Sequence, residues 1–217
     1  EFTRANVTVT AGVTNALSNL TWTVPHAGGY LAWEIGIPDR SAREFRHGST
    51  DYWRAFLWEE FANEFTNPLE YTVGTSNWSN DWNYAHCGYL VGTNWSGWKW
   101  RIHFNLASVP AGGNATLVLA WAGSDHARMQ FYVNDETTQF GANHYPPNGG
   151  GNALIREGIH AKYGVSSISI PVSRLRVGAN TITLLQGRST TASDHVMYDY
   201  VSLEMPGAPP PPVDRER

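Results

Sequence analysis

The stretch WKWRIHFNL, residues 98–106, alternates apolar and polar side chains without interruption. Drawn as a β-strand, it separates two sets of side chains, Trp98, Trp100, Ile102, Phe104 and Leu106 on one face and Lys99, Arg101, His103 and Asn105 on the other. A period of two residues indicates a strand with one buried face. The chain is therefore predicted to contain a sheet whose inner face carries two of its ten tryptophans.

Further segments share this strand character and are separated by clusters of Gly, Pro and Asn. They are residues 115–122, 127–134, 166–172, 180–186 and 195–204. Short strands without helices between them indicate an all-β fold, an antiparallel β-sandwich of the jelly-roll type. The longest predicted loop, residues 134–164, exceeds the ordinary loop length, and an ordered loop of this length usually has a function.

One short helix is predicted within STDYWRAFLWEEFANEF, residues 49–65. Ser49, Thr50 or Asp51 would be its N-cap, and Pro68 limits its end. Apolar residues follow at helical spacing and would form one face: Trp53, Phe56, Leu57, Phe61 and Phe65.

The two ends of the chain differ from its middle. Residues 206–217 begin with PGAPPPPV, which predicts an extended, semi-rigid polyproline linker. Residues 1–28 are either the last strand of a preceding module or an arm on the main domain. Residues 29–205 are then predicted to form the jelly-roll domain.

Composition and charge exclude several classes of function. Charged residues make up 16% of the chain, and the net charge is −4 without any block of basic residues. Nucleic acid is therefore not expected as a partner, because phosphate binding needs clustered Lys or Arg. No apolar run approaches 18 residues, so no membrane span and no membrane partner are expected.

Cysteine and asparagine usage bear on the compartment. Cys87 is the only cysteine, so no internal disulfide can form, which by itself favours a reducing compartment. Five N-x-S/T sequons point instead to a secreted glycoprotein: Asn6, Asn19, Asn77, Asn94 and Asn114. Secretion is the prediction that we carry forward.

Several segments resemble, in the same order, the C-terminal domain of family 4 polysaccharide lyases, which are rhamnogalacturonan endolyases. They include LAWEIGIPDRSAREF (31–45), YTVGTSNWSNDWNYA (71–85), QFYVND (130–135), GNALIREGIHAKYG (151–164) and VMYDYVSLE (196–204). The resemblance covers residues 30–205. It implies a jelly roll similar to carbohydrate-binding modules and galactose-binding domains, placed after a catalytic domain and a fibronectin-like domain. NVTVTAG, residues 6–12, resembles the closing strand of that middle domain.

The resemblance does not extend to catalysis. The family's catalytic Lys and His lie in its first domain, and no part of this chain matches that domain. None of the histidines or lysines here is assigned a catalytic role. The chain is thus predicted to be either a fragment of such a lyase or a binding module.

The segment GNALIREGIHAKYG supplies the first candidate site. Galacturonic acid offers a carboxylate for a guanidinium fork and hydroxyls for amide or imidazole partners. The glycine-flanked loop carries groups of these kinds: Asn152, Arg156, His160, Lys162 and Tyr163. The alternative is that Arg156 and His160 only tie the loop to the sandwich.

A second group, Arg188, Asp194 and His195, lies at the entry to the last predicted strand. It could form one composite edge with the long loop, or an ordinary hairpin with solvated polar groups.

Asp199 lies within the last predicted strand, on the face of Met197, Val201 and Leu203. A carboxylate on an apolar face must be paired, hydrogen-bonded or bound to a metal. Modules similar to this one often hold a structural Ca²⁺ between the first and last strands, so Asp199 and Asp39, with Glu44, are its candidate ligands. The alternative is an ion pair with Arg40 or Arg43, or a buried hydrogen bond.

Three tryptophans in predicted loops, Trp78, Trp82 and Trp95, could stack on sugar rings. Two of them directly follow sequon asparagines, and a glycan there would crowd a stacking platform. We therefore interpret all three as scaffold.

Together these features favour a secreted, non-catalytic module that binds plant cell-wall polysaccharide, rhamnogalacturonan or another acidic pectic glycan, and targets an attached enzyme. No cofactor is required beyond the possible Ca²⁺, and the domain is expected to be a monomer covalently linked to other modules. Two alternatives stay open. One is a small lyase that uses Arg156, His160 and Tyr163. The other is a purely structural domain.

Overall fold

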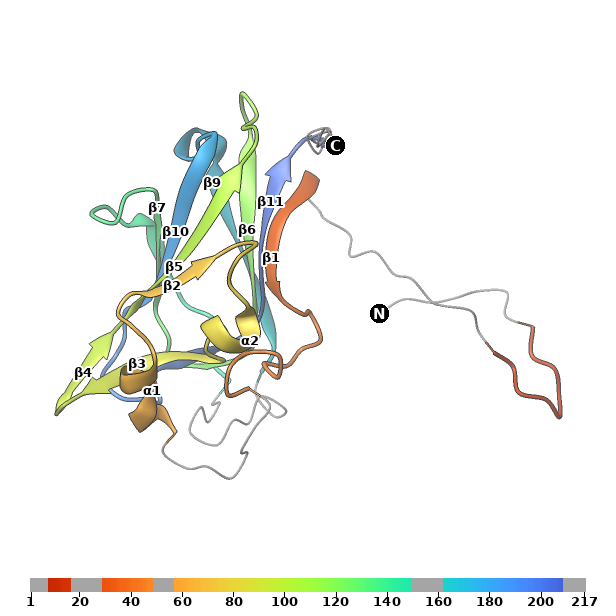
Figure 1. Ribbon diagram of the computed structural model, residues 1–217, viewed down its shortest axis with the longest axis horizontal. Helices are drawn as coiled ribbons and strands as arrows, with labels where there is room; N and C mark the ends of the chain where they lie inside the picture. The colour runs from red at the N-terminus through yellow and green to blue at the C-terminus, as the bar shows by residue number, and fades with distance from the viewer. Residues whose placement is uncertain (1–7, 17–28, 49–56, 150–161, 209–217) are drawn as a thin grey trace.

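The computed structural model describes residues 8–16, 29–48, 57–149 and 162–208, and in this part of the chain it is a two-sheet β-sandwich (Figure 1). The predicted all-β sandwich is confirmed. Residues 8–16 are exposed and belong to no strand.

One sheet has six strands, with β11 near its centre. Its members are β1 (Gly29–Gly36), β3 (Ala85–Val91), β4 (Asn94–Gly97), β6 (Asn114–Asp125), β9 (Gly164–Pro171) and β11 (His195–Pro206). The order is β4-β3-β11-β6-β9, and β1 pairs with the C-terminal half of β11. All of these pairings are antiparallel.

The other sheet has five strands in the order β2-β5-β10-β7-β8. Its members are β2 (Leu69–Thr72), β5 (Lys99–Leu106), β7 (Met129–Val133), β8 (Phe140–His144) and β10 (Gly178–Gln186). Only β2 runs parallel to its neighbour, β5; the other pairs are antiparallel.

All six strand segments named from the sequence are strands in the structure, as β5, β6, β7, β9, β10 and β11. The sequence did not locate the strands β1, β2, β3 and β4 individually. The prediction that residues 134–164 form one loop is wrong, because β8 lies inside it and pairs with β7. β8 is only five residues long and its side chains are mostly exposed, so it lacks the apolar alternation that marks a strand.

The described helices are short. The predicted helix is α1, which spans Trp58–Glu64 and so begins later than expected; the proposed N-caps at 49–51 lie outside the described residues. A helical turn α2 (Trp78–Asp81) and a 3₁₀ turn η1 (Val172–Arg174) had not been predicted. No helix in the described residues is long and apolar enough to cross a membrane.

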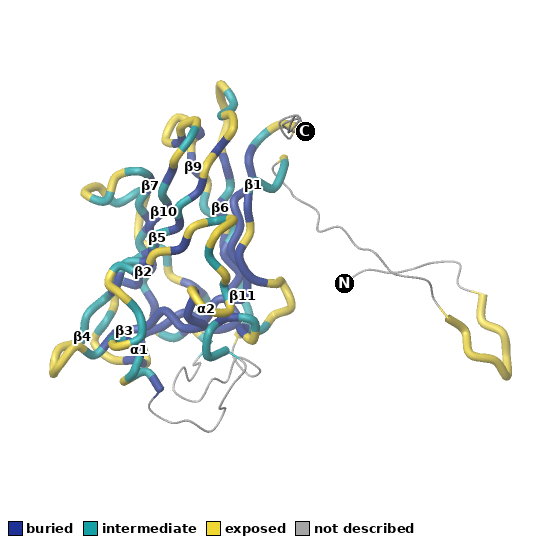
Figure 2. The backbone as a smooth tube through the Cα atoms, in the orientation of Figure 1, coloured by how far each residue is buried: buried dark blue, intermediate teal, exposed yellow. Residues whose placement is uncertain are grey.

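Buried residues run along the strands of both sheets (Figure 2), and the core between the sheets is rich in aromatic rings. Along β5 the burial alternates as predicted, with Trp100 and Ile102 fully buried and Lys99 and Arg101 facing outward. Trp82 is also fully buried and packs edge-on against Trp100, with ring centroids 4.9 Å apart. The inner faces are therefore filled, and the polar faces of the same strands remain available for a ligand.

Candidate functional site

The outward face of the five-stranded sheet carries a band of polar side chains. β5 contributes Lys99, Arg101 and His103, all partly exposed. In the register of the sheet, Thr183 of β10 and Glu70 of β2 both lie opposite Arg101. Directly opposed residues share a face, so this band is assembled by strand pairing.

The connection between β7 and β8 folds over this band. Asn134 adopts a left-handed backbone conformation (φ 57°), and its Oδ1 accepts a hydrogen bond from the Thr181 backbone N–H at 2.8 Å. Asp135 Oδ1 then accepts from both the backbone N–H and the hydroxyl of Thr137, at 2.8 and 2.6 Å. This local turn sets the backbone position of Glu136, which lies between Asp135 and Thr137 in the chain.

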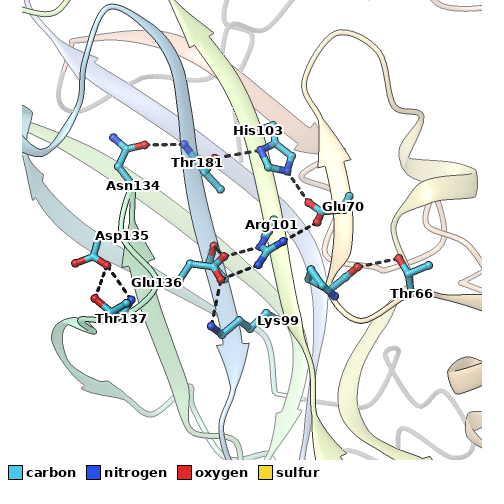
Figure 3. Close-up of polar contacts among 12 residues, drawn as sticks. Thr66, Glu70, Lys99, Arg101, His103, Asn134, Asp135, Glu136, Thr137 and Thr181 are labelled. Atoms are coloured by element: carbon cyan, nitrogen blue, oxygen red, sulfur yellow. Dashed lines mark hydrogen bonds and ion pairs between the residues drawn. The ribbon is translucent and has the colours of Figure 1, made fainter.

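Glu136 lies over β5 and β10, where four donors meet its carboxylate (Figure 3). Arg101 donates from Nε to Oε1 at 2.5 Å and from Nη2 to Oε2 at 2.8 Å. Lys99 Nζ and the Thr183 hydroxyl donate at 3.2 and 2.7 Å. The hydrogen bonds from Arg101, and then those from Thr183 and Lys99, lower the pKa of Glu136 to about 2. Glu136 is therefore ionised and acts as an acceptor, not as an acid.

A pocket of about 240 Å³ opens beside this contact; we call it the sheet-face groove. Every residue that lines it has a polar side chain: Arg101, His103, Asn134, Asp135, Glu136, Arg176, Thr181 and Thr183. The volume is below the roughly 300–1,000 Å³ of pockets for drug-sized ligands, so it suits one small ring of a larger molecule. The charges of its two arginines and two carboxylates cancel.

Arg176 is the exposed cation at this groove. Its Nε donates to the Ala179 carbonyl at 2.7 Å, and within the described residues its terminal Nη groups have no hydrogen-bond partner. Two N–H groups on a planar guanidinium match a carboxylate in fork geometry. The groove can therefore bind one anionic group at Arg176 and hydroxyls at the neighbouring carboxylates and threonines.

The long-loop site is described only in part. Asn152, Arg156 and His160 lie outside the described residues. Lys162 is exposed and Tyr163 is half-buried, with the Arg40 guanidinium 5.3 Å from its ring centroid. Burial raises the pKa of the Tyr163 phenol, and the neighbouring Asp199 carboxylate raises it further.

The second predicted group forms a turn and presents few groups to solvent. Asp194 is buried, and its Oδ2 accepts from the Thr190 backbone N–H and hydroxyl at 3.1 and 2.6 Å. His195 is fully buried and bonds the Ser193 carbonyl through Nδ1 at 2.8 Å. A surface saccharide cannot reach these two side chains, so we correct that prediction. Arg188 is exposed, 3.5 Å from Asp194 Oδ1.

Asp199 is fully buried and is hydrogen-bonded. Its Oδ1 accepts from the backbone N–H groups of Asp39, Arg40 and Ser41 at 3.1, 2.8 and 3.2 Å. Register shifts flank Tyr198, whose ring packs against Trp82, so β11 does not follow a simple two-residue alternation around Asp199. Asp199 thus anchors the turn that follows β1.

The turn after β1 has some features that favour the predicted calcium site and others that disfavour it. Asp199 Oδ2 and Glu44 Oε2 are buried without a hydrogen-bond partner, and such hard oxygens suit Ca²⁺. Three N–H groups at Asp199 Oδ1 disfavour a cation at that atom. Among the described residues no group of three His, Cys, Asp or Glu side chains is arranged to hold a metal ion. The calcium site stays a prediction.

The carboxyl group of Glu44 should make the stability of the fold depend on pH. Burial raises its pKa to about 7, and the carboxylates of Asp39 and Asp199 add to the rise. A raised acid pKa means that the folded state keeps a proton that the unfolded chain releases, so stability falls as pH rises from about 4.5 to about 7. In EDTA, Glu44→Gln should therefore be more stable than wild type at pH 7.5, by on the order of 1–2 kcal/mol after discounting for solvent screening.

The two proteins should converge in denaturant titrations at pH 4.5, whereas Glu59→Gln, at an exposed helix position, should match wild type throughout. A constant difference across pH would contradict the raised pKa. A large rise in the melting temperature of wild type with Ca²⁺, absent in Glu44→Gln, would support the metal site.

The loop tryptophans behave as scaffold, as interpreted. Trp82 is buried, and the half-buried Trp95 packs on Trp58 with centroids 5.0 Å apart. Trp78 is half-buried against the core. The described sequon asparagines, Asn77, Asn94 and Asn114, are all exposed; Asn6 and Asn19 lie outside the described residues.

Comparison with known families gives a direct match to the sandwich. The family model described as CBM-like, polysaccharide lyase family 4, domain III matches residues 31–203. The chain belongs to this family. The match begins in β1 and ends in β11, so it covers both sheets of this domain III and the groove.

Longer proteins similar to this domain III include fungal ones. The chain is 27% identical over 254 residues to a probable rhamnogalacturonate lyase B of Aspergillus fumigatus, and 24% identical over 255 residues to rhamnogalacturonate lyase B of Emericella nidulans. Each match covers 94% of this chain and 37% of the relative. The chain thus spans little more than a third of the relatives' length.

Solved structures similar to this domain III include carbohydrate-binding modules. A family 35 module from an environmental isolate is 19% identical, with a TM-score of 0.31 over 53% of this chain and 72% of that one. A family 35 module from Clostridium thermocellum is 21% identical, with a TM-score of 0.32 over 48% and 69%. The sandwich assignment for this domain III rests on its own strands.

Sequence reasoning missed the groove of this domain III, although it placed Lys99, Arg101 and His103 on one face. A usable signal was NDE at 134–136, which puts turn-forming residues and a carboxylate directly after a strand.

Proposed function

We propose that this domain III binds an acidic pectic polysaccharide of the rhamnogalacturonan I type without cleaving it, and holds an attached enzyme near that polymer. The observation that carries the proposal is the sheet-face groove, where the Arg176 fork stands beside carboxylates and threonine hydroxyls. A galacturonate carboxylate would bind Arg176, and ring hydroxyls would donate to the second oxygen of Asp135. Guanidinium forks bind carboxylates more specifically than ammonium groups do.

The long loop extends this surface in the proposal. Lys162 and Tyr163 offer a cation and a half-exposed ring, and Asn152, Arg156 and His160 would add to them. Shallow, polar contacts of this kind give modest affinity. A modest affinity suffices for targeting, because a tethered enzyme experiences a high effective concentration of polymer.

Two findings support the polymer class: the family model refers to polysaccharide lyases, and the relatives are named rhamnogalacturonate lyases. We further propose that the domain is secreted and monomeric in a larger protein. Three exposed sequon asparagines are available for glycosylation.

The first rival is lyase activity through Tyr163, His160 and Arg156. A base at the uronate C5 works best with a pKa near the operating pH. The pKa of Tyr163 is raised above its usual value, so its phenol stays protonated, which disfavours this role. Incubation with rhamnogalacturonan while following the absorbance of the unsaturated product tests it: a rising signal would contradict the binding-only proposal.

The second rival is a purely structural domain. Affinity electrophoresis against rhamnogalacturonan, polygalacturonate, xylan and a soluble cellulose derivative separates the two. We expect retardation by the acidic pectic polymers. An unchanged mobility in every gel would favour the structural role.

Arg176→Ala should weaken binding to rhamnogalacturonan about tenfold, equivalent to about 1.4 kcal/mol, because one charge-assisted hydrogen-bonded pair is lost. The melting temperature should change little, since the guanidinium makes one described hydrogen bond, to a backbone carbonyl. Isothermal titration or quantitative affinity electrophoresis measures the loss.

Arg174→Ala is the matched control, because Arg174 is exposed two residues earlier and contacts Phe140 rather than the groove. It should bind like wild type. An equal loss in both variants would indicate a general charge effect, and no loss in Arg176→Ala would place the ligand elsewhere.

A further inference from the structure

We propose that Lys99, Arg101 and Thr183 form a carboxylate-binding subsite that the chain's own Glu136 fills, and that a uronate carboxylate of a polysaccharide competes with Glu136 for it. This inference rests on the proposed function and names a second contact within the same groove. Its chemical class of ligand is an anionic sugar that carries a planar carboxylate.

The donors and the acceptor of this subsite come from different parts of the fold. Lys99, Arg101 and Thr183 project from β5 and β10, whose register fixes their backbone positions independently of Glu136. Glu136 arrives from the β7–β8 connection, outside the strands (Figure 3). The donor set therefore belongs to the rigid sheet, and the carboxylate belongs to a loop that lies on it.

The geometry selects a carboxylate. Arg101 donates from two nitrogens to the two oxygens of Glu136, which is the planar fork arrangement. Lys99 and Thr183 each add one donor, one to each oxygen. A sugar hydroxyl offers a single oxygen and cannot reproduce the paired contact, so a neutral sugar gains little here.

The ion pairs of Glu136 are partly open to solvent, so a carboxylate from outside can take the place of Glu136. The side chains of Arg101, Glu136 and Lys99 keep 31%, 27% and 33% of their surface exposed. Ion pairs open to solvent contribute little to stability, so an external carboxylate can replace Glu136 without unfolding the sheet.

Tethering explains why Glu136 holds the subsite in the free protein. A group on a short loop competes at an effective concentration of about the millimolar range or above. An external uronate must exceed this effective concentration to displace Glu136. The affinity of wild type for acidic polymer is therefore lower than the affinity that Lys99, Arg101 and Thr183 would give without Glu136.

The test replaces the internal carboxylate by its neutral analogue. Glu136→Gln keeps the shape and a hydrogen-bonding oxygen but loses the charge that pairs with Arg101 Nε and Nη2, while Glu70 still accepts from Nη1 at 2.9 Å. Its affinity for polygalacturonate should rise about five- to tenfold, while binding to the fully methyl-esterified polymer, which lacks the charge, should stay unchanged. Isothermal titration at fixed ionic strength gives both values.

Glu59→Gln is the matched control, because it makes the same Glu→Gln change at an exposed helix position outside the groove. It should not show the gain in affinity. Adding Arg101→Gln to Glu136→Gln should abolish the gain, because the guanidinium fork is then absent.

The outcomes separate this subsite from the proposed function. A wild type that binds polygalacturonate, with no gain in Glu136→Gln or an equal gain in Glu59→Gln, overturns the subsite alone. A lowered melting temperature in Glu136→Gln without tighter binding also overturns it, since Glu136 would then be a structural staple. Failure of wild type and Glu136→Gln to bind any pectic polymer overturns both proposals.

Discussion

Trp82→Ala is expected to destabilise the domain by about 3–5 kcal/mol, the usual cost of removing a buried tryptophan side chain. Trp82 is fully buried and lies where both sheets meet. Its ring contacts Tyr71, Trp100 and Tyr198, with centroid distances of 5.5, 4.9 and 5.2 Å and nearly perpendicular planes. Edge-to-face contacts of this kind contribute beyond the buried area itself.

The loss should lower the melting temperature by roughly 10 °C or more, given about 2–4 °C for each kcal/mol in a domain of this size. Thermal unfolding followed by near-ultraviolet circular dichroism measures it. Trp78→Ala is the matched control, because Trp78 lies at the start of α2 and is only half-buried. Equal effects of the two substitutions would show that Trp82 does not hold the centre of the core.

Acid should destabilise the folded domain through His86. This imidazole is fully buried and stacks on Trp100, with centroids 4.2 Å apart. Its Nε2 bonds the Trp98 carbonyl at 2.8 Å, and its Nδ1 accepts from the Tyr198 hydroxyl at 3.1 Å. A carbonyl can only accept, so Nε2 carries the proton and the neutral ring satisfies both partners.

The direction of the effect follows from the pKa. Burial lowers the pKa of His86 from its usual 6.5 to about 3. The unfolded chain therefore binds a proton between these values that the folded state rejects, and stability is lost as pH falls through this window. By pH 4 the loss from this one residue is about 3 kcal/mol. His195 acts in the same direction, since burial lowers its pKa to about 4.

His86→Gln isolates the contribution, because the amide can serve both partners but does not titrate. When the pH is lowered from 7 to 4, wild type should lose about 3 kcal/mol more unfolding free energy than this variant, as measured by denaturant titrations. His126→Gln, at a more exposed histidine, should show no comparable shift. Parallel curves for wild type and His86→Gln would contradict the lowered pKa.

Local pattern predicted those elements whose two faces differ in polarity. The alternation in WKWRIHFNL correctly assigned the buried and exposed sides of β5, because burial of its apolar face dominates the energetics of the strand. β8 escaped prediction because both of its faces are largely exposed. The register shifts around Tyr198 in β11 also escaped prediction, because periodicity does not reveal them.

The site was less predictable than the fold. The sequence located Lys162 and Tyr163 in a candidate loop, but it placed buried His195 among the surface ligands. Burial of a histidine depends on which strands cover it, and here β11 pairs with both β3 and β6 at that residue.

Local pattern and motifs were enough to predict a β-sandwich, the residues of β5 that face its core, and the family of the chain. The contact between Glu136 and Arg101, 35 residues apart along the chain, emerged only from the folded arrangement. Periodicity follows from burial of each strand alone, whereas the meeting of two charged side chains depends on the order and register of β5, β10 and β7. The groove exists because those pairings place its donors and its acceptor together.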